Sequence, residues 1–182
     1  MNVNSMARLF SEVLAIQVET GKHGSFAPAR LREALTTGPS LSEAERRLLL
    51  LSPVARSDFQ RMRRQVNAEI QQRLDQLGAE CQLYALAADS EEGTVSLKGN
   101  GFGVTLYRRS ELGVPWVILV QLGPAYLQAI NPMTVLRLVD SGGLEWCRGK
   151  PDGQGEITAS WDDRETDILA RSKRFSLSLE PV

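Results

Sequence analysis

The sequence predicts an α+β protein in which the helices come first and the strands follow. Three observations lead to this prediction. Apolar residues recur at every third or fourth position up to Leu77, Gly78 interrupts that pattern, and apolar residues then alternate with polar ones. We therefore expect a helical region over residues 1–77, with about four helices, packed on an antiparallel β-sandwich or barrel-like domain over residues 79–182.

The stretch 52–77 carries the clearest helical pattern. Ser52 is a residue type that caps helices, and Pro53 suits the first helical position because its missing N–H would have no partner there. Gly78 supplies the left-handed residue that commonly ends a helix. The apolar stripe between these signals consists of Ala55, Phe59, Met62, Val66, Ile70, Leu74 and Leu77.

Shorter helices are expected before this long one. Residues 28–35 begin with a proline, and a capping box of Ser40 with Glu43, or of Ser42 with Glu45, opens the next helix. That helix contains the run 48–51 of four leucines, which we expect to be buried between neighbours because it is apolar on more than one face. A further amphipathic helix is expected over residues 3–18, with an apolar face of Met6, Leu9, Phe10, Val13, Leu14 and Val18.

About eight short strands are expected after Gly78, separated by turns rich in glycine. Trp116–Val120 is apolar on both faces and should be a central strand, and the three tryptophans should lie in the core. The predicted strands are Cys81–Ala88, Thr94–Lys98, Phe102–Arg108, Trp116–Leu122, Thr134–Val139, Leu144–Cys147, Glu156–Trp161 and Arg174–Leu179. Between the fourth and fifth of these, residues 125–130 are expected to make a helical turn.

Composition and charge narrow the classes of partner. The apolar fraction is 42% and the net charge is −1, so the chain as a whole has no strong field toward nucleic acid or a membrane. No apolar run approaches the ~20 residues of a membrane helix. The N-terminus lacks the layout of a secretory signal, so we expect a cytoplasmic protein without membrane contact. Cys81 and Cys147 are then expected to be buried, reduced thiols.

Conventional catalytic and cofactor patterns are not found in the sequence. It has one histidine and two distant cysteines, which do not supply a typical zinc site, and it lacks the usual nucleophile motifs. We therefore predict no cofactor, no metal and no catalytic residue. The leading hypothesis is a non-enzymatic cytoplasmic interaction or regulatory protein that acts through protein–protein contacts, with self-association through the helices as a by-product.

Two sets of residues are candidates for a site. Arg56, Arg61, Arg63 and Arg64 cluster on the long helix and could bind a partner protein or, as a second alternative, bind nucleic acid weakly. Asp140, Asp152, Asp162 and Asp163 are predicted in loops of the β-domain. They support the main alternative, a small-ligand-binding protein or a carboxylate-dependent enzyme, or an ion site.

Overall fold

The computed structural model describes residues 25–78, 80–81, 84–85, 94–109, 114–161 and 167–182. The helix expected over residues 3–18 lies outside these ranges. The chain forms two compact units, Met1–Val66 and Asn67–Val182, and each is considered by itself below. The division falls inside the long helix α4 (Pro53–Gln76), earlier in the chain than the Gly78 boundary expected from the sequence.

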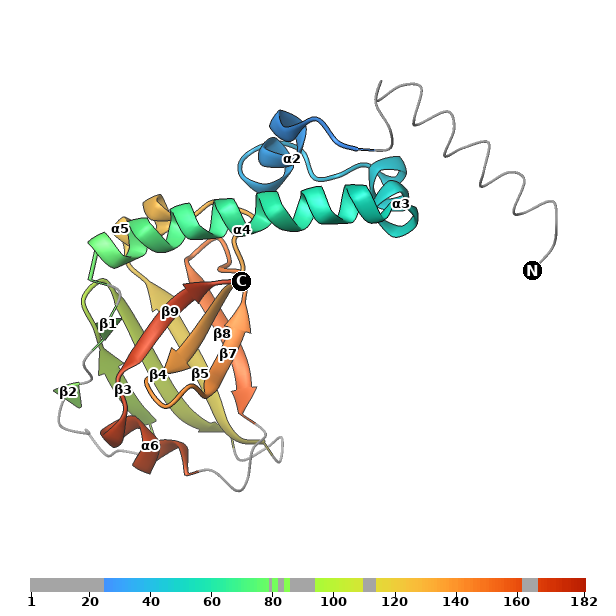
Figure 1. Cartoon of the computed structure of the whole chain (residues 1–182). Coiled ribbons are helices and arrows are strands. Elements are labelled where there is room, and N and C mark those ends of the chain that lie inside the picture. Colours follow the sequence, from blue (N-terminus) through green and yellow to red (C-terminus); the bar gives the residue numbers. More distant parts are fainter. Residues whose placement is uncertain (1–24, 79, 82–83, 86–93, 110–113, 162–166) are drawn as a thin grey trace. The chain divides into compact units, whose positions relative to one another are not determined.

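The first unit contains α2 (Pro28–Leu35), α3 (Glu43–Leu51) and the first half of α4 (Figure 1). Of the two capping boxes that the sequence allowed, the one formed by Ser42 and Glu45 opens α3. The Ser52 hydroxyl accepts a hydrogen bond from the Ala55 amide, which caps α4 as predicted. The small core of these helices consists of Phe26, Leu31, Leu48 and Ala55, with Leu41, Leu49, Phe59 and Met62 packed against it.

Arg30 of α2 stabilises the loop between α2 and α3 through hydrogen bonds. The Arg30 guanidinium donates two hydrogen bonds of 2.8 Å to the carboxylate of Glu45, which also belongs to the capping box. It donates two more to the carbonyl oxygens of Pro39 and Ser40 in the connecting loop. One planar side chain therefore binds the loop, the cap and the second helix at once, as the forked shape of guanidinium allows.

The second unit contains the end of α4 and all the described strands. Ile70 and Leu74 are buried, which completes the predicted apolar stripe, and Gly78 adopts a φ of 74° where the helix ends. One sheet has the order β1-β9-β6-β7 and the other the order β2-β3-β4-β5-β8, and every pairing is antiparallel. The first sheet is formed by β1 (Glu80–Cys81), β9 (Leu177–Pro181), β6 (Leu136–Asp140) and β7 (Glu145–Gly149), and the second by β2 (Tyr84–Ala85), β3 (Thr94–Lys98), β4 (Phe102–Arg109), β5 (Val114–Leu122) and β8 (Glu156–Trp161).

The α+β class and the antiparallel sheets predicted from the sequence are confirmed, and two separate sheets fit a sandwich. Strand β5 pairs on both sides, with β4 and β8, as its apolar sequence predicts. Trp116, Trp146 and Trp161 are all buried, and the rings of Trp146 and Trp161 join the two sheets at a centroid distance of 6.1 Å. How the helical region packs on the β-domain stays a prediction.

Two short helices accompany the sheets and lie at opposite ends of them (Figure 1). The first, α5 (Pro124–Ala129), is the helical turn expected after the central strand. The second, α6 (Ile168–Arg174), was not expected, and the predicted strand Arg174–Leu179 is wrong at its start because β9 begins only at Leu177. The Asp167 carboxylate accepts hydrogen bonds from the Leu169 and Ala170 amides, and this N-cap starts α6.

Two further findings concern the thiol of Cys147 and the apolar character of the helices. Cys147 is a free, buried thiol, as expected, and burial raises its pKa to about 12, so it stays protonated at neutral pH. Among the helices that the structure describes, none combines the length and the apolar character needed to cross a membrane.

The contacts of Arg30 generate a prediction about the helical unit. Replacing Arg30 with methionine should speed amide hydrogen exchange in residues 38–46 by about five- to tenfold, because the hydrogen bonds that hold the loop and the cap are lost. The expected effect is small because both partners are partly exposed. Exchange measured by mass spectrometry would check it. Arg63→Met on exposed α4 is the matched control, and equal exchange in both variants would contradict the role of Arg30.

Candidate functional site

An exposed apolar corner lies where α3 meets α4. The side chains of Leu50, Leu51 and Val54 are 74%, 48% and 52% exposed, although all three are large and apolar. The helices are joined by Ser52 alone, so these three residues come from the last turn of α3 and the first turn of α4. We refer to Leu50, Leu51 and Val54 as the apolar corner.

The expectation that the whole leucine run is buried is wrong. Leu48 is buried and Leu49 packs partly against the same core, whereas Leu50 and Leu51 face solvent. Successive residues of a helix are rotated by about 100°, so four in a row point in nearly every direction. Only some of them can face a core that lies on one side of α3.

The four candidate arginines do not form one patch. Arg56 donates hydrogen bonds to the carbonyl oxygens of Leu50 and Leu49, at 2.7 and 3.5 Å, and so caps the end of α3. Arg61 forms an ion pair of 2.5 Å with Asp58 one turn earlier. Counting about 100° per residue places Arg61 within about 20° of Val54 around α4, Arg64 about 80° away and Arg63 on the opposite side. Arg61, paired with Asp58, is therefore the arginine best aligned with the corner.

Asp140 has a structural position at the end of β6. Its side chain is fully buried, and each carboxylate oxygen accepts hydrogen bonds. The amides of Gly142 and Leu144 donate to Oδ1 at 2.9 and 3.0 Å, so the carboxylate closes the turn between β6 and β7. The Trp146 indole donates to Oδ2 at 2.8 Å. A ligand at Asp140 would have to displace these contacts.

The main partner of Asp140 is Arg171 of α6. Its Nη2 donates to Oδ1 at 3.0 Å and its Nε donates to Oδ2, while the guanidinium lies 4.4 Å from the centre of the Phe175 ring. A Cβ at residue 142 would lie 2.7 Å from Arg171 Nη2, so the glycine there makes room for the pair. Burial alone would raise the pKa of the Asp140 carboxyl, but the hydrogen bonds from Arg171, Trp146 and the Leu144 amide outweigh burial and lower it to about 2.

Asp152 lies at the other end of β7, in the turn before β8. Its Oδ1 accepts hydrogen bonds from the Gln154 and Glu156 amides, which lower its pKa. Asp140 and Asp152 flank opposite ends of a five-residue strand. They are therefore separated by roughly 16 Å along its axis, and cannot act as a carboxylate pair on one substrate. Asp162 and Asp163 lie outside the described residues.

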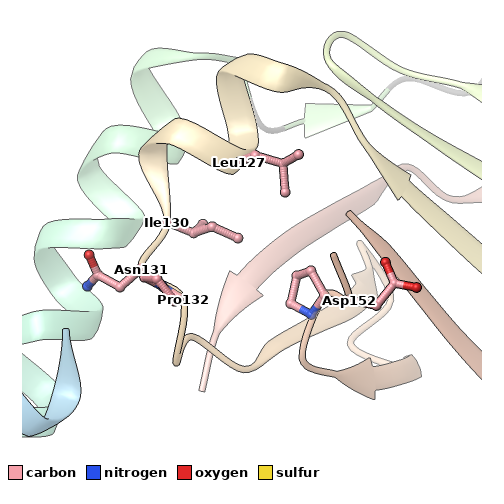
Figure 2. A pocket seen from close by; sticks show the side chains of 6 residues that line it. Leu127, Ile130, Asn131, Pro132 and Asp152 are labelled. Atoms are coloured by element: carbon pink, nitrogen blue, oxygen red, sulfur yellow. The ribbon is translucent and has the colours of Figure 1, made fainter. Parts of the chain in front are cut away.

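A small pocket lies beside Asp152, at the α5 end of the sheets. Its cavity measures about 130 Å³ and is lined by Leu127, Ile130, Asn131, Pro132, Pro151 and Asp152. Figure 2 shows Leu127 and Ile130 directed toward the space between α5 and the loop that carries Asp152. Most ligand sites measure roughly 300–1,000 Å³, so this pocket has room for one side chain or a fragment.

Comparison with known proteins adds no further candidate. The chain matches no protein-family model, no curated protein and no solved structure. In the part of the chain that the structure describes, no group of three or more histidine, cysteine, aspartate or glutamate side chains is arranged to hold a metal ion. The site therefore has to be argued from the geometry of the apolar corner and the pocket.

Sequence reasoning missed two arginines, Arg30 and Arg171, whose contacts hold separate segments together. Arg30 and Arg171 pair with acidic residues that lie 15 and 31 positions away, a separation at which no local pattern relates two charges. A local signal did exist for α6, because Asp167 is followed by a run of good helix formers. The apolar corner also had a signal, since a run of four leucines in a short amphipathic helix must expose some of them.

We expect Asp140→Asn to lower the free energy of unfolding of the β-domain by about 2–3 kcal/mol. The substitution removes the charge that Arg171 pairs with and leaves that guanidinium partly buried without its partner. Urea unfolding followed by tryptophan fluorescence would measure the change. Asp152→Asn is the matched control and should leave the free energy of unfolding close to the wild-type value, because asparagine serves equally well in an exposed turn. Equal losses in the two variants would refute the structural role of Asp140.

The lowered pKa of Asp140 also predicts acid sensitivity. Because its folded-state pKa of about 2 is below the ordinary value of 3.8, the ionised carboxylate stabilises the fold fully above about pH 4. That contribution, about 2 kcal/mol, should disappear as the pH falls from 4 through 2. Urea titrations between pH 6 and 2 would show it. Asp140→Asn should flatten this part of the profile, and an unchanged profile would assign the acid sensitivity to other carboxyl groups.

Proposed function

We propose that this chain is a non-enzymatic interaction protein whose helical unit binds a partner protein through the apolar corner. The exposure of Leu50, Leu51 and Val54 is the observation that carries the proposal. Grouped exposed apolar side chains are a recurrent feature of protein–protein interaction sites. A cytoplasmic location and a regulatory role fit this reading and remain part of the proposal.

The size of the corner limits what it can do alone. Covering the exposed parts of three such side chains contributes on the order of 3–4 kcal/mol, which by itself corresponds to millimolar binding. A stable complex needs further contacts around this centre. The Arg61–Asp58 ion pair and Arg64 flank the corner on α4 and supply a polar rim, as is usual around the apolar centre of an interface.

The pocket beside Asp152 supports the alternative of a small-ligand-binding protein. Apolar side chains line one side, and the Asp152 carboxylate favours a positively charged group at the rim. The volume of about 130 Å³ restricts the ligand to one fragment, which makes this hypothesis weaker than the first.

A carboxylate-dependent enzyme has less support, because Asp140 and Asp152 flank opposite ends of β7. Nucleic-acid binding also has less support, because Arg56 and Arg61 already have intramolecular partners.

A test of the proposed function compares companions recovered with tagged full-length protein from its native host. The wild-type chain should recover a protein in near-stoichiometric amount, and the double variant Leu50→Asp, Leu51→Asp should recover at least tenfold less. Tenfold corresponds to about 1.4 kcal/mol, well within what the corner can contribute. Mass spectrometry would quantify the companion.

The matched control for this experiment is Met133→Asp, which changes another exposed apolar residue far along the chain. It should recover as much companion as the wild type, and urea unfolding should show that both variants stay folded. A companion retained by the double variant would contradict the proposed site. A wild-type preparation without any companion would contradict the proposed function and favour the pocket.

A further inference from the structure

The outer face of the larger sheet carries two neighbouring rows of uncharged side chains. Leu97, Ile118 and Ile157 are buried on its inner face, so the residues that alternate with them along each strand point outward. The strand register aligns these outward residues in rows across β3, β4, β5 and β8. The first row is Thr94, Tyr107, Val117 and Ser160, and the second is Ser96, Thr105, Leu119 and Thr158. We refer to these two rows as the uncharged face.

The uncharged face has an apolar centre and a polar rim. Its two outer strands, β3 and β8, contribute four exposed hydroxyl side chains. Its two central strands contribute Tyr107, Val117 and Leu119, which are half-buried or buried. Because 24% of the chain is charged, about two charges would be expected among eight residues, and this face has none. Loss of charge at the centre and a polar rim are the usual features of a protein–protein interface.

A third row borders the uncharged face and carries opposite charges at its two ends. Lys98 lies on β3 and Glu156 on β8, with Gly103 and Gln121 between them in register. The Gln121 amide donates a hydrogen bond of 3.4 Å to the Glu156 carboxylate, so both side chains lie on this face. Three strand spacings separate Lys98 from Glu156, which is about 14 Å, so the two charges do not pair within one chain.

A second copy of the chain matches this arrangement of charges. A two-fold axis that runs along the strands, midway between β4 and β5, places β3 of one copy over β8 of the other and keeps each row opposite itself. Lys98 of each copy then lies opposite Glu156 of the other copy, which gives two favourable charge contacts. The hydroxyl side chains of the outer strands face one another, and so do the apolar centres.

We infer that two copies of this chain associate through their uncharged faces, with Lys98 of each copy opposite Glu156 of the other. The face covers roughly 300 Å² of sheet, from the strand spacing and the rise per residue. A standard interface buries about 800 Å² on each partner, so the dimer should be weak, with a dissociation constant of about 0.1–1 mM. This surface belongs to the second unit, and the inference goes beyond the function proposed for the helical unit.

A charge exchange tests the contact in the full-length chain. Sedimentation equilibrium at concentrations up to about 1 mM should show the wild-type dimer. Lys98→Glu and Glu156→Lys should each weaken association at least about tenfold, because each variant brings like charges together twice. The double variant Lys98→Glu, Glu156→Lys should restore the wild-type dissociation constant. A pair within one chain cannot cause this rescue, because the two residues are about 14 Å apart.

The matched control is Lys150→Glu, which makes the same change of charge at an exposed lysine outside the three rows. It should dimerise like the wild type, and urea unfolding should show that all variants stay folded. A wild type that stays monomeric up to about 1 mM would overturn the inference. Single variants that associate as strongly as the wild type would overturn it, and so would a double variant that stays as weak as the single ones.

Dilution of the wild type, followed by the NMR shifts of its amides, gives a second measurement that needs no variant. The shifts that change with concentration should map to β3, β4, β5 and β8. Changes confined to α3 and α4 would overturn the inference, because self-association would then use the apolar corner. The companion experiment is independent of these results, since a partner protein can bind the corner of a monomer and a dimer can form without any companion.

Discussion

The buried pair of Asp140 and Arg171 is the interaction on which the C-terminal part of the fold depends. The Asp140 carboxylate closes the β6–β7 turn through backbone amides, holds the Trp146 indole in the core, and binds α6 through Arg171. A carboxylate in this place is costly unless its hydrogen-bonding capacity is satisfied, and here five donors satisfy it. The Ser141 amide also donates to the Ser176 carbonyl, so the turn is tied to the segment that leads into β9. Asp140 thus fixes a turn and a helix, and its neighbour Ser141 ties the same turn to the approach of the last strand.

The division into helices followed by strands could be predicted because it depends on local periodicity and on turn residues. Helix α2 and the strands Thr94–Lys98 and Glu156–Trp161 have the bounds that the sequence indicated, since a proline or a glycine-containing turn marks at least one of their ends. Helix α6 was missed because its seven residues are too few for a clear apolar period, and the acidic run before it resembles a loop. The candidate site was predicted less well. An aspartate after a strand can be a ligand or a buried anchor, and only its distant partner, Arg171, decides between the two.

The leucine run shows why the surface is harder to predict than the core. A repeat such as Ala55, Ile70 and Leu74 identifies residues that share a face, and all three are buried. Four leucines in succession have no preferred face, so their burial depends on how many neighbours surround α3. The described helical unit provides only a small core, formed around Phe26, Leu31, Leu48 and Ala55. Leu50 and Leu51 lie outside it, and no property of the run itself tells which of its members do so.

The two units of the chain differ in whether their energetically costly groups have partners within the fold. In the β-domain the costly group is the charge of Asp140, and the chain satisfies it internally with Arg171, Trp146 and two amides. In the helical unit the costly groups are the apolar side chains of the corner, and no described residue covers them. A charge whose hydrogen bonds are all made within the fold needs no further partner. Leucines that face water, in contrast, lack the hydrophobic stabilisation that burial would give them. A function that depends on contact with another surface is therefore best sought at the corner, and Asp140 is best understood as part of the construction of the β-domain.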